Sequence, residues 1–225
     1  MPKTIEFRHR AREVSRVEAF SDVVFGFAIS LLVVSLEAPK NYEEMIRVLH
    51  GFLPFAICFL LFIGIWFEHH RFYKRYAMHD MPTTMLNTVL LFVVLFYVYP
   101  LKFMAILMVN GRREDIPPGG DTMLFTVYGM GFAAVFWLFA AMYARAYRKR
   151  DELDLNEVER IDTRESIWDN LFMGSFGIIS LLIAQFAPRW AGPVYFLICI
   201  PKTLVPWIFG RKRRRHEERL IAAAA

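Results

Sequence analysis

Residues Glu18–Leu36 read EAFSDVVFGFAISLLVVSL, a stretch with most of its polar residues at the start and a long apolar run behind them. An α-helix rises about 1.5 Å per residue, so roughly 20 apolar residues cross a hydrocarbon core of about 30 Å. The apolar residues are continuous instead of alternating with polar ones, which disfavours a strand of an outer-membrane barrel. The stretch therefore predicts a membrane-spanning helix.

Similar apolar runs recur along the rest of the chain. The protein has 225 residues, of which 56% are hydrophobic and 16% aromatic, and its mean hydropathy is +0.33. A soluble domain of this length seldom has so apolar a composition. We therefore predict an all-α integral membrane protein with a single transmembrane domain over residues 1–225. Its six spans are expected at about 18–36, 48–67, 84–109, 122–143, 167–187 and 190–209.

The last predicted span is the least regular, because Pro193, Pro201 and Pro206 interrupt it and Lys202 lies inside it. A charge within a span must reach the interface, face protein or line water. Arg211 follows closely enough that we expect Lys202 to extend its ammonium group to the same interface.

The distribution of basic residues predicts the orientation. Twenty of the 27 lysine and arginine residues fall in four segments that six spans would place on one side, namely residues 1–16, 71–75, 145–164 and 211–219. Positive charge accumulates on the cytoplasmic side of membrane proteins. Both termini are therefore expected in the cytoplasm, with the protein in the cell membrane. The basic tail after residue 210 is interpreted as a topology anchor that meets anionic lipid.

Several functional classes are disfavoured by the composition. Cys58 and Cys199 both lie in apolar runs, so neither a disulfide framework nor a thiolate metal site is indicated, and no cofactor is expected. The net charge of +5 is explained by membrane orientation, so no nucleic-acid partner is expected. The chain has no H-E-x-x-H or G-x-S-x-G motif, and we expect that it is not an enzyme.

A polar cluster opens the first predicted span. Arg16 and Asp22 lie nearly opposite one another on a helix, so they do not pair along it. Together with Ser21 they need partners on other helices, or else Ser21 and Asp22 simply cap the helix start. Polar candidates at similar depth are His69, His70, Asn87, Asp169 and Asn170.

Deeper in the same span, Ile29, Val33 and Leu36 form one aliphatic stripe at helical spacing. By periodicity alone, such a stripe faces lipid or another helix more often than a pore. Gly26 and Ser30 form a pair of small residues one turn apart, which can let another helix approach closely.

The segment from Arg16 to Leu32 resembles the first-helix signature of the prokaryotic relatives of the lysosomal potassium channel, the transmembrane-protein-175 family. It contains R-x-x-x-F-S-D followed by small and aliphatic residues. Further matches are Trp66-Phe-Glu-His-His70 and Asn87 followed by aliphatic residues up to Pro100. The chain departs from the pattern at Ser30, where threonine is common, and at Val33, where leucine is usual.

The resemblance implies a homotetrameric, potassium-preferring cation channel with six spans per subunit and the first helix lining the pore. Its partners would be K⁺, with other monovalent cations as further candidates, the lipid bilayer and copies of itself. No TVGYG filter sequence is present. By position, Ile29, Val33 and Leu36 would form stacked hydrophobic rings. The residues expected to form a structural polar network behind them are Arg16, Ser21, Asp22, His70 and Asn87.

These rings could gate by dewetting, and partial dehydration at Ile29 would favour K⁺ over Na⁺. Ser30 would add a pore-adjacent hydroxyl group. Glu37, with Glu43 and Glu44, would lie at the outer mouth, or else in an ordinary exposed acidic loop. A secondary or proton-coupled cation transporter is the alternative interpretation, in which Arg16, Asp22 and Lys202 would be the coupling sites.

Overall fold

The computed structural model describes residues 7–11, 13–34, 40–50, 52–110, 119–198, 202–210 and 213. Within these residues, all regular structure is helical, as the sequence predicts. The elements in chain order are α1 (Arg16–Val34), α2 (Tyr42–His50), α3 (Phe52–Tyr76), α4 (Met81–Asn110), α5 (Gly120–Arg148), α6 (Glu157–Phe186), α7 (Pro188–Ala191) and the 3₁₀ helix η1 (Pro193–Ile198). A further helical stretch covers residues 202–210.

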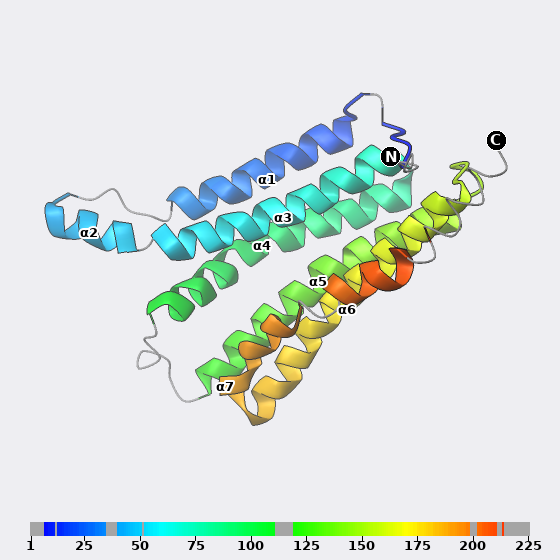
Figure 1. Ribbon diagram of the computed structural model, residues 1–225. Coiled ribbons are helices and arrows are strands. Elements are labelled where there is room, and N and C mark those ends of the chain that lie inside the picture. The colour runs from blue at the N-terminus through cyan, green and yellow to red at the C-terminus, as the bar shows by residue number, and fades with distance from the viewer. Residues whose placement is uncertain are drawn as a thin grey trace, which may run out of the picture.

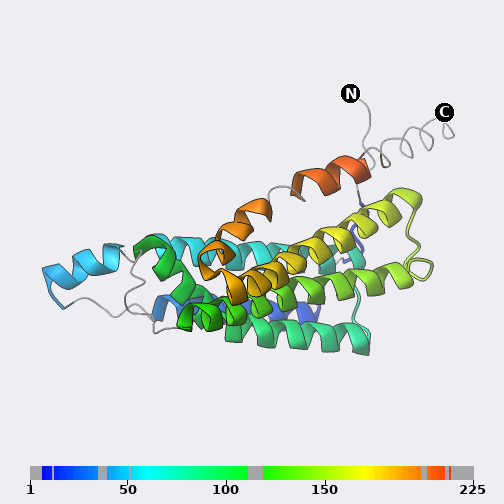
Figure 2. The ribbon, with the colours of Figure 1, turned by 90° about the horizontal axis from the view of Figure 1, so that it is seen from below.

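The long helices form two groups that meet at α4 (Figure 1). One group contains α1, α3 and α4, which contact one another, and the other is the antiparallel pair α5 and α6. Helix α4 contacts α5 and so joins the two groups. Helix α7, η1 and the stretch 202–210 return along α6, whereas α2 stands apart from the bundle (Figure 2).

Four helices of the described chain are long and apolar enough to cross a membrane, over Phe55–Tyr76, Met81–Phe103, Gly120–Arg148 and Glu157–Phe186. They correspond to the second to fifth predicted spans. The helix that contains the fifth span begins at Glu157, well before the expected residue 167. Asn156 explains this early start: its side chain accepts from Glu159 N while the Glu159 carboxylate accepts from Asn156 N, a capping box.

The first and sixth predicted spans have different outcomes. Helix α1 begins at Arg16, two residues before the expected start, and residues 35–36 lie outside the described part of the chain. The continuous span expected over 190–209 is instead divided into α7, η1 and the stretch 202–210. Pro188 and Pro193 begin two of these pieces, because proline lacks the N–H that a helix interior requires.

Helices α5 and α6 approach each other at two glycines. A Cβ atom added to Gly129 would lie 2.5 Å from the carbonyl oxygen of Gly177, and one added to Gly177 would lie 2.9 Å from the amide nitrogen of Ala133. Real Cβ atoms do not come so close to backbone. The two helices therefore pack backbone against backbone, as small residues allow in membrane proteins.

An ion pair stabilises the end of the bundle where α3 is followed by α4. Asp80 lies between these helices, and Arg145 on α5 donates from Nε to its Oδ2 over 2.9 Å. Thr83 donates to the other oxygen over 2.8 Å. Burial alone would raise the pKa of Asp80, but the hydrogen bonds from Arg145 and Thr83 and the charge of Arg145 hold this pKa below its ordinary value.

The N-terminal segment is fixed at the same end. The buried carboxylate of Glu159 on α6 binds the guanidinium groups of Arg8 at 3.0 Å and Arg10 at 2.8 Å. The backbone nitrogen of Arg8 also donates to Glu159 over 2.9 Å. These contacts tie the residues immediately before α1 to a helix on the other side of the bundle.

Candidate functional site

Helix α1 has one face buried against the protein. Ser21, Phe25, Ala28 and Leu32 recur every three or four residues and are each at most 2% exposed. This spacing places them on one side of the helix, where α1 contacts α3 and α4. The buried face therefore fixes which residues remain on the other side.

The opposite face of α1 is apolar and uncovered in the single chain. Phe20, Val23, Phe27 and Val33 are between 49% and 69% exposed. Gly26 lies among them, and a Cβ atom added there would meet nothing within 4 Å. No described helix of the same chain therefore uses this surface for close packing.

The residues predicted to form the constriction lie towards the edge of this face. Ile29 is partly buried and packs against the core, whereas Val33 is 49% exposed. Ser30 is exposed, and its hydroxyl donates to the carbonyl oxygen of Gly26 over 2.9 Å. Leu36 and Glu37 lie outside the described residues.

A chain of buried hydrogen bonds joins α1, α4 and α3. Ser21 Oγ donates to Val17 O over 2.8 Å and accepts from Asn87 Nδ2 over 2.9 Å. Asn87 Oδ1 in turn lies 2.9 Å from His69 Nε2. Ser21 and His69 are fully buried and Asn87 is 2% exposed. The bonds therefore replace interactions that these groups would otherwise make with water.

The other residues of the predicted network lie around this chain. Asp22 accepts a hydrogen bond from Trp66 Nε1 over 2.8 Å. His70 does not join Asn87; its ring stacks on Trp66, and its Nδ1 lies 3.8 Å from Glu18. Arg16 is the first residue of α1 and is exposed.

Sequence reasoning did not single out Trp66 and Glu18 as partners, or choose His69 over His70. The register of α3 contains a signal for the histidines. Its fully buried positions include Cys58, Phe62 and Phe72. Continuing their spacing of three or four residues places His69 on the buried side and His70 beside it. Among the described residues, no group of three or more His, Cys, Asp or Glu side chains could hold a metal ion.

A family model described as the endosomal/lysosomal potassium channel TMEM175 matches residues 16–97, which contain α1 and the whole hydrogen-bonded chain. A protein of Marivirga tractuosa named "Potassium channel" is 39% identical over 236 residues, covering 96% of this chain and 94% of the relative. The chain belongs to the TMEM175 family. The family predicted from residues 16–36 is therefore confirmed, and it is a family of ion channels, not a class of enzymes.

Solved TMEM175 structures share the fold. A crystal structure of a variant of the potassium channel MtTMEM175, bound to a nanobody fusion protein, superimposes with a TM-score of 0.81 at 35% identity. The match covers 96% of this chain and all of that one. A TMEM175 homologue from Chamaesiphon minutus, described as a lysosomal potassium-selective channel homologue, shows the same fold at 22% identity and a TM-score of 0.61, over 87% of this chain and 99% of that one.

A second polar feature lies between the two helix groups. Lys202 Nζ contacts Asp169 Oδ2 on α6 at 2.6 Å, and its side chain is 49% exposed. The pair borders a largely apolar cavity of about 230 Å³ between α3, α4, α5 and α6. Glu68 lies at the same border and accepts a hydrogen bond from Tyr143 over 2.8 Å.

Proposed function

We propose that this protein is a potassium-preferring cation channel of the cell membrane. The observation that carries the proposal is the 39% identity to a protein named as a potassium channel over nearly the full length of both chains. K⁺ would be the main permeant ion, with other monovalent cations as further candidates.

The proposed pore lies on the axis of a homotetramer, with α1 of each subunit lining it and residues 1–225 forming one transmembrane channel domain of six spans. The uncovered apolar face of α1 supports this arrangement, because Phe20, Val23 and Phe27 have no cover within the described chain. Gly26 supports it as well, since its open surroundings allow a helix of a second subunit to approach closely.

The proposed constriction consists of rings of Ile29, Val33 and Leu36. A narrow apolar neck excludes water and ions until it widens. Ile29 follows Asp22 by seven residues, or roughly 10 Å along the axis, which places the neck inside the membrane. K⁺ gives up part of its hydration at a lower cost than Na⁺, so partial dehydration at Ile29 would favour K⁺. Rotation of α1 would bring the Ser30 hydroxyl towards the ion.

In this proposal, the polar contacts of α1 hold the pore helix in register. Ser21 and Asp22 are bonded to Asn87 and Trp66, so α1 is attached to both α4 and α3. The end of the bundle that contains Arg8 and Asp80 would face the cytoplasm, together with both termini. The concentration of basic residues near this end supports that orientation.

Recording from purified protein in planar bilayers tests the proposed constriction. Ile29→Asn should increase the unitary conductance and lower the K⁺/Na⁺ permeability ratio, because a polar neck holds water more readily. Leu182→Asn is the matched control: it places the same polar group on α6, at a position that is 54% exposed and remote from α1. If Ile29→Asn and the wild type give identical currents, Ile29 does not line the pore.

The same recordings separate a channel from a secondary or proton-coupled transporter. A channel gives unitary currents that reverse at a potential set by the K⁺ gradient, whereas a carrier gives neither. Arg16, Asp22 and Lys202 are the coupling sites that a carrier mechanism would use, and Lys202 is paired with Asp169. Current that persists in Lys202→Met with unchanged unitary conductance would argue against such a mechanism.

A further inference from the structure

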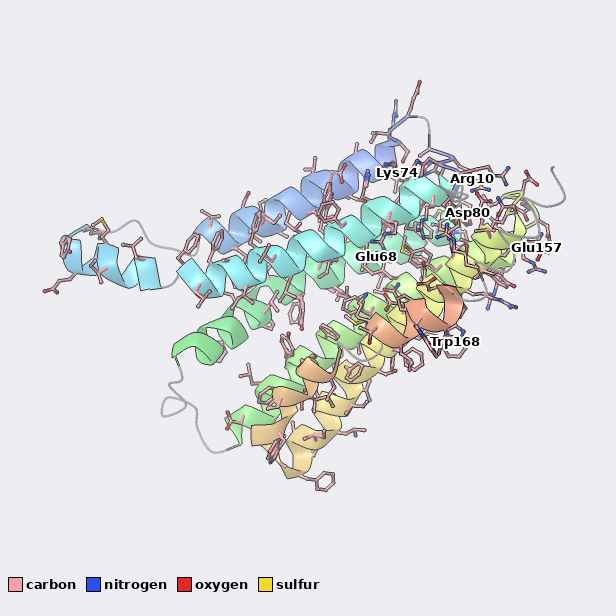
Figure 3. All side chains as sticks on the ribbon, viewed as in Figure 1. Arg10, Glu68, Lys74, Asp80, Glu157 and Trp168 are labelled. Carbon is pink, nitrogen blue, oxygen red and sulfur yellow. The ribbon has the colours of Figure 1, made fainter. Side chains whose placement is uncertain are left out.

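A basic pocket opens between the N-terminal segment and the last turns of α3. Its volume is about 440 Å³, and it lies at the end of the bundle where Figure 3 labels Lys74 and Arg10. It does not include the exposed face of α1 or the chain of hydrogen bonds around Asn87. The residues that line it are Phe7, His9, Phe67, His70, Arg71, Lys74, Arg75, Asp162 and Arg213.

The pocket has an excess of positive charge. Two of its cations have acidic neighbours: Arg71 contacts Glu68 at 3.0 Å, and Arg213 contacts Asp162 at 3.3 Å. Neither Lys74 nor Arg75 forms an ion pair with any residue that the structure describes. These two side chains therefore give the pocket its surplus charge.

The position of Arg75 is fixed by uncharged contacts. Its guanidinium carbon lies 4.7 Å from the centre of the Phe7 ring, and its Nη1 lies 3.4 Å from Ser166 Oγ. Lys74 is exposed, and its carbonyl oxygen accepts from the backbone nitrogen of Arg10 over 3.2 Å. The pocket therefore has one cation held in place and one cation free to reach a ligand.

An apolar stripe leads from this pocket along α3. Leu53, Leu60 and Phe67 are 55%, 66% and 55% exposed and precede Lys74 at intervals of seven residues. Two helical turns separate each of them from the next, so all four side chains lie on nearly the same face. Phe67 lines both the pocket and the stripe. A ligand with a charged head and a long apolar tail fits this combination.

We propose that the pocket binds the phosphate headgroup of an anionic phospholipid, whose acyl chain lies along Phe67 and Leu60, the two stripe residues within one leaflet of Lys74. The phosphate contacts Lys74 and Arg75, and the tail covers the part of the stripe nearest the pocket. A free phosphate ion offers the same headgroup chemistry but leaves the stripe exposed. A phospholipid satisfies both features at once.

Native mass spectrometry of protein purified with phosphatidylglycerol and phosphatidylcholine tests the proposal. The wild type should retain phosphatidylglycerol in preference to phosphatidylcholine. Lys74→Gln should lower the retained phosphatidylglycerol about fivefold, since a basic residue near an anionic lipid contributes on that order. Lys74→Arg should restore retention. The double variant Arg148→Gln and Lys149→Gln is the control, because it removes two cations at the end of α5 that do not line the pocket.

Three results would overturn the proposal. Equal retention of the two lipids by the wild type would show that the pocket does not select the anionic headgroup. Displacement of phosphatidylglycerol by millimolar inorganic phosphate would identify a soluble anion as the ligand. A change in the number of subunits in Lys74→Gln, with lipid retention unchanged, would show that a second copy of the chain covers the pocket.

Discussion

Asn87 on α4 donates a hydrogen bond to Ser21 on α1 over a distance of 2.9 Å, and its carbonyl oxygen lies 2.9 Å from the imidazole of His69 on α3. A single amide thereby joins three helices inside an apolar bundle. Because the bond from Asn87 to Ser21 crosses between helices, rotation of the proposed pore helix has to break it.

Replacing this amide should destabilise the bundle. Asn87→Ala leaves Ser21 and His69 buried without their partner, which should lower the free energy of unfolding by about 1–3 kcal/mol. Thermal unfolding in detergent measures the loss. Thr88→Ala is the control, because Thr88 is exposed and bonds only to its own helix through Thr84 O. Equal stability of the two variants would mean that the amide contributes nothing.

The ion pair between Asp80 and Arg145 should make stability depend on acid pH. The pKa of Asp80 is lower in the folded protein than its ordinary value of about 3.9. The ionised carboxylate therefore stabilises the folded protein fully above that value, and this contribution is lost as the pH falls through the folded pKa. Between pH 7 and pH 3, the free energy of unfolding should fall less in Asp80→Asn than in the wild type. Glu152→Gln, which removes an exposed carboxylate at the same end, should keep the wild-type profile.

The contact between α5 and α6 should not tolerate a methyl group. Gly177→Ala forces backbone atoms apart and should cost about 1–3 kcal/mol, a typical value for overpacking. Gly64→Ala is the control, since a Cβ atom there meets nothing within 4 Å. The melting temperatures of the two variants test this expectation. If Gly177→Ala melts at the same temperature as Gly64→Ala, the two helices can move apart without a loss of stability.

The buried carboxylate of Glu159 should protect the N-terminal segment from proteolysis. Glu159→Gln removes the charge that holds Arg8 and Arg10, so trypsin should cleave after these residues faster than in the wild type. Glu157→Gln, an exposed position two residues earlier, should leave the cleavage rate unchanged. Identical cleavage of all three proteins would indicate that backbone contacts alone hold the segment.

The helical class and the family followed from residues near the N-terminus, because a long apolar run and an R-x-x-x-F-S-D motif are both local features. The partners of the motif were harder to assign. His69 and His70 are adjacent and chemically identical, so only the burial pattern of α3 distinguishes them. Trp66 could not be matched to Asp22, because its indole serves equally well as an apolar side chain and as a donor.

The region after α6 shows where local reasoning fails. Lys202 and Asp169 are 33 residues apart, and nothing near either residue indicates the other. The apolar content of residues 190–209 predicts one span, yet its described part contains separate helical pieces, one of which begins at Pro193. Hydropathy measures how apolar a segment is, whereas its path depends on the backbone donors that proline removes.

The contact between Arg8 and Glu159 also constrains how the protein is made. The two residues are 151 positions apart. Arg8 therefore cannot reach Glu159 until most of the polypeptide has been translated. Helix α1 would find its partners on α3 and α4 early, whereas the segment before it would be fixed late. An interrupted translation product that ends before residue 159 would therefore leave the segment before α1 unattached and accessible to the quality-control proteases of the cell.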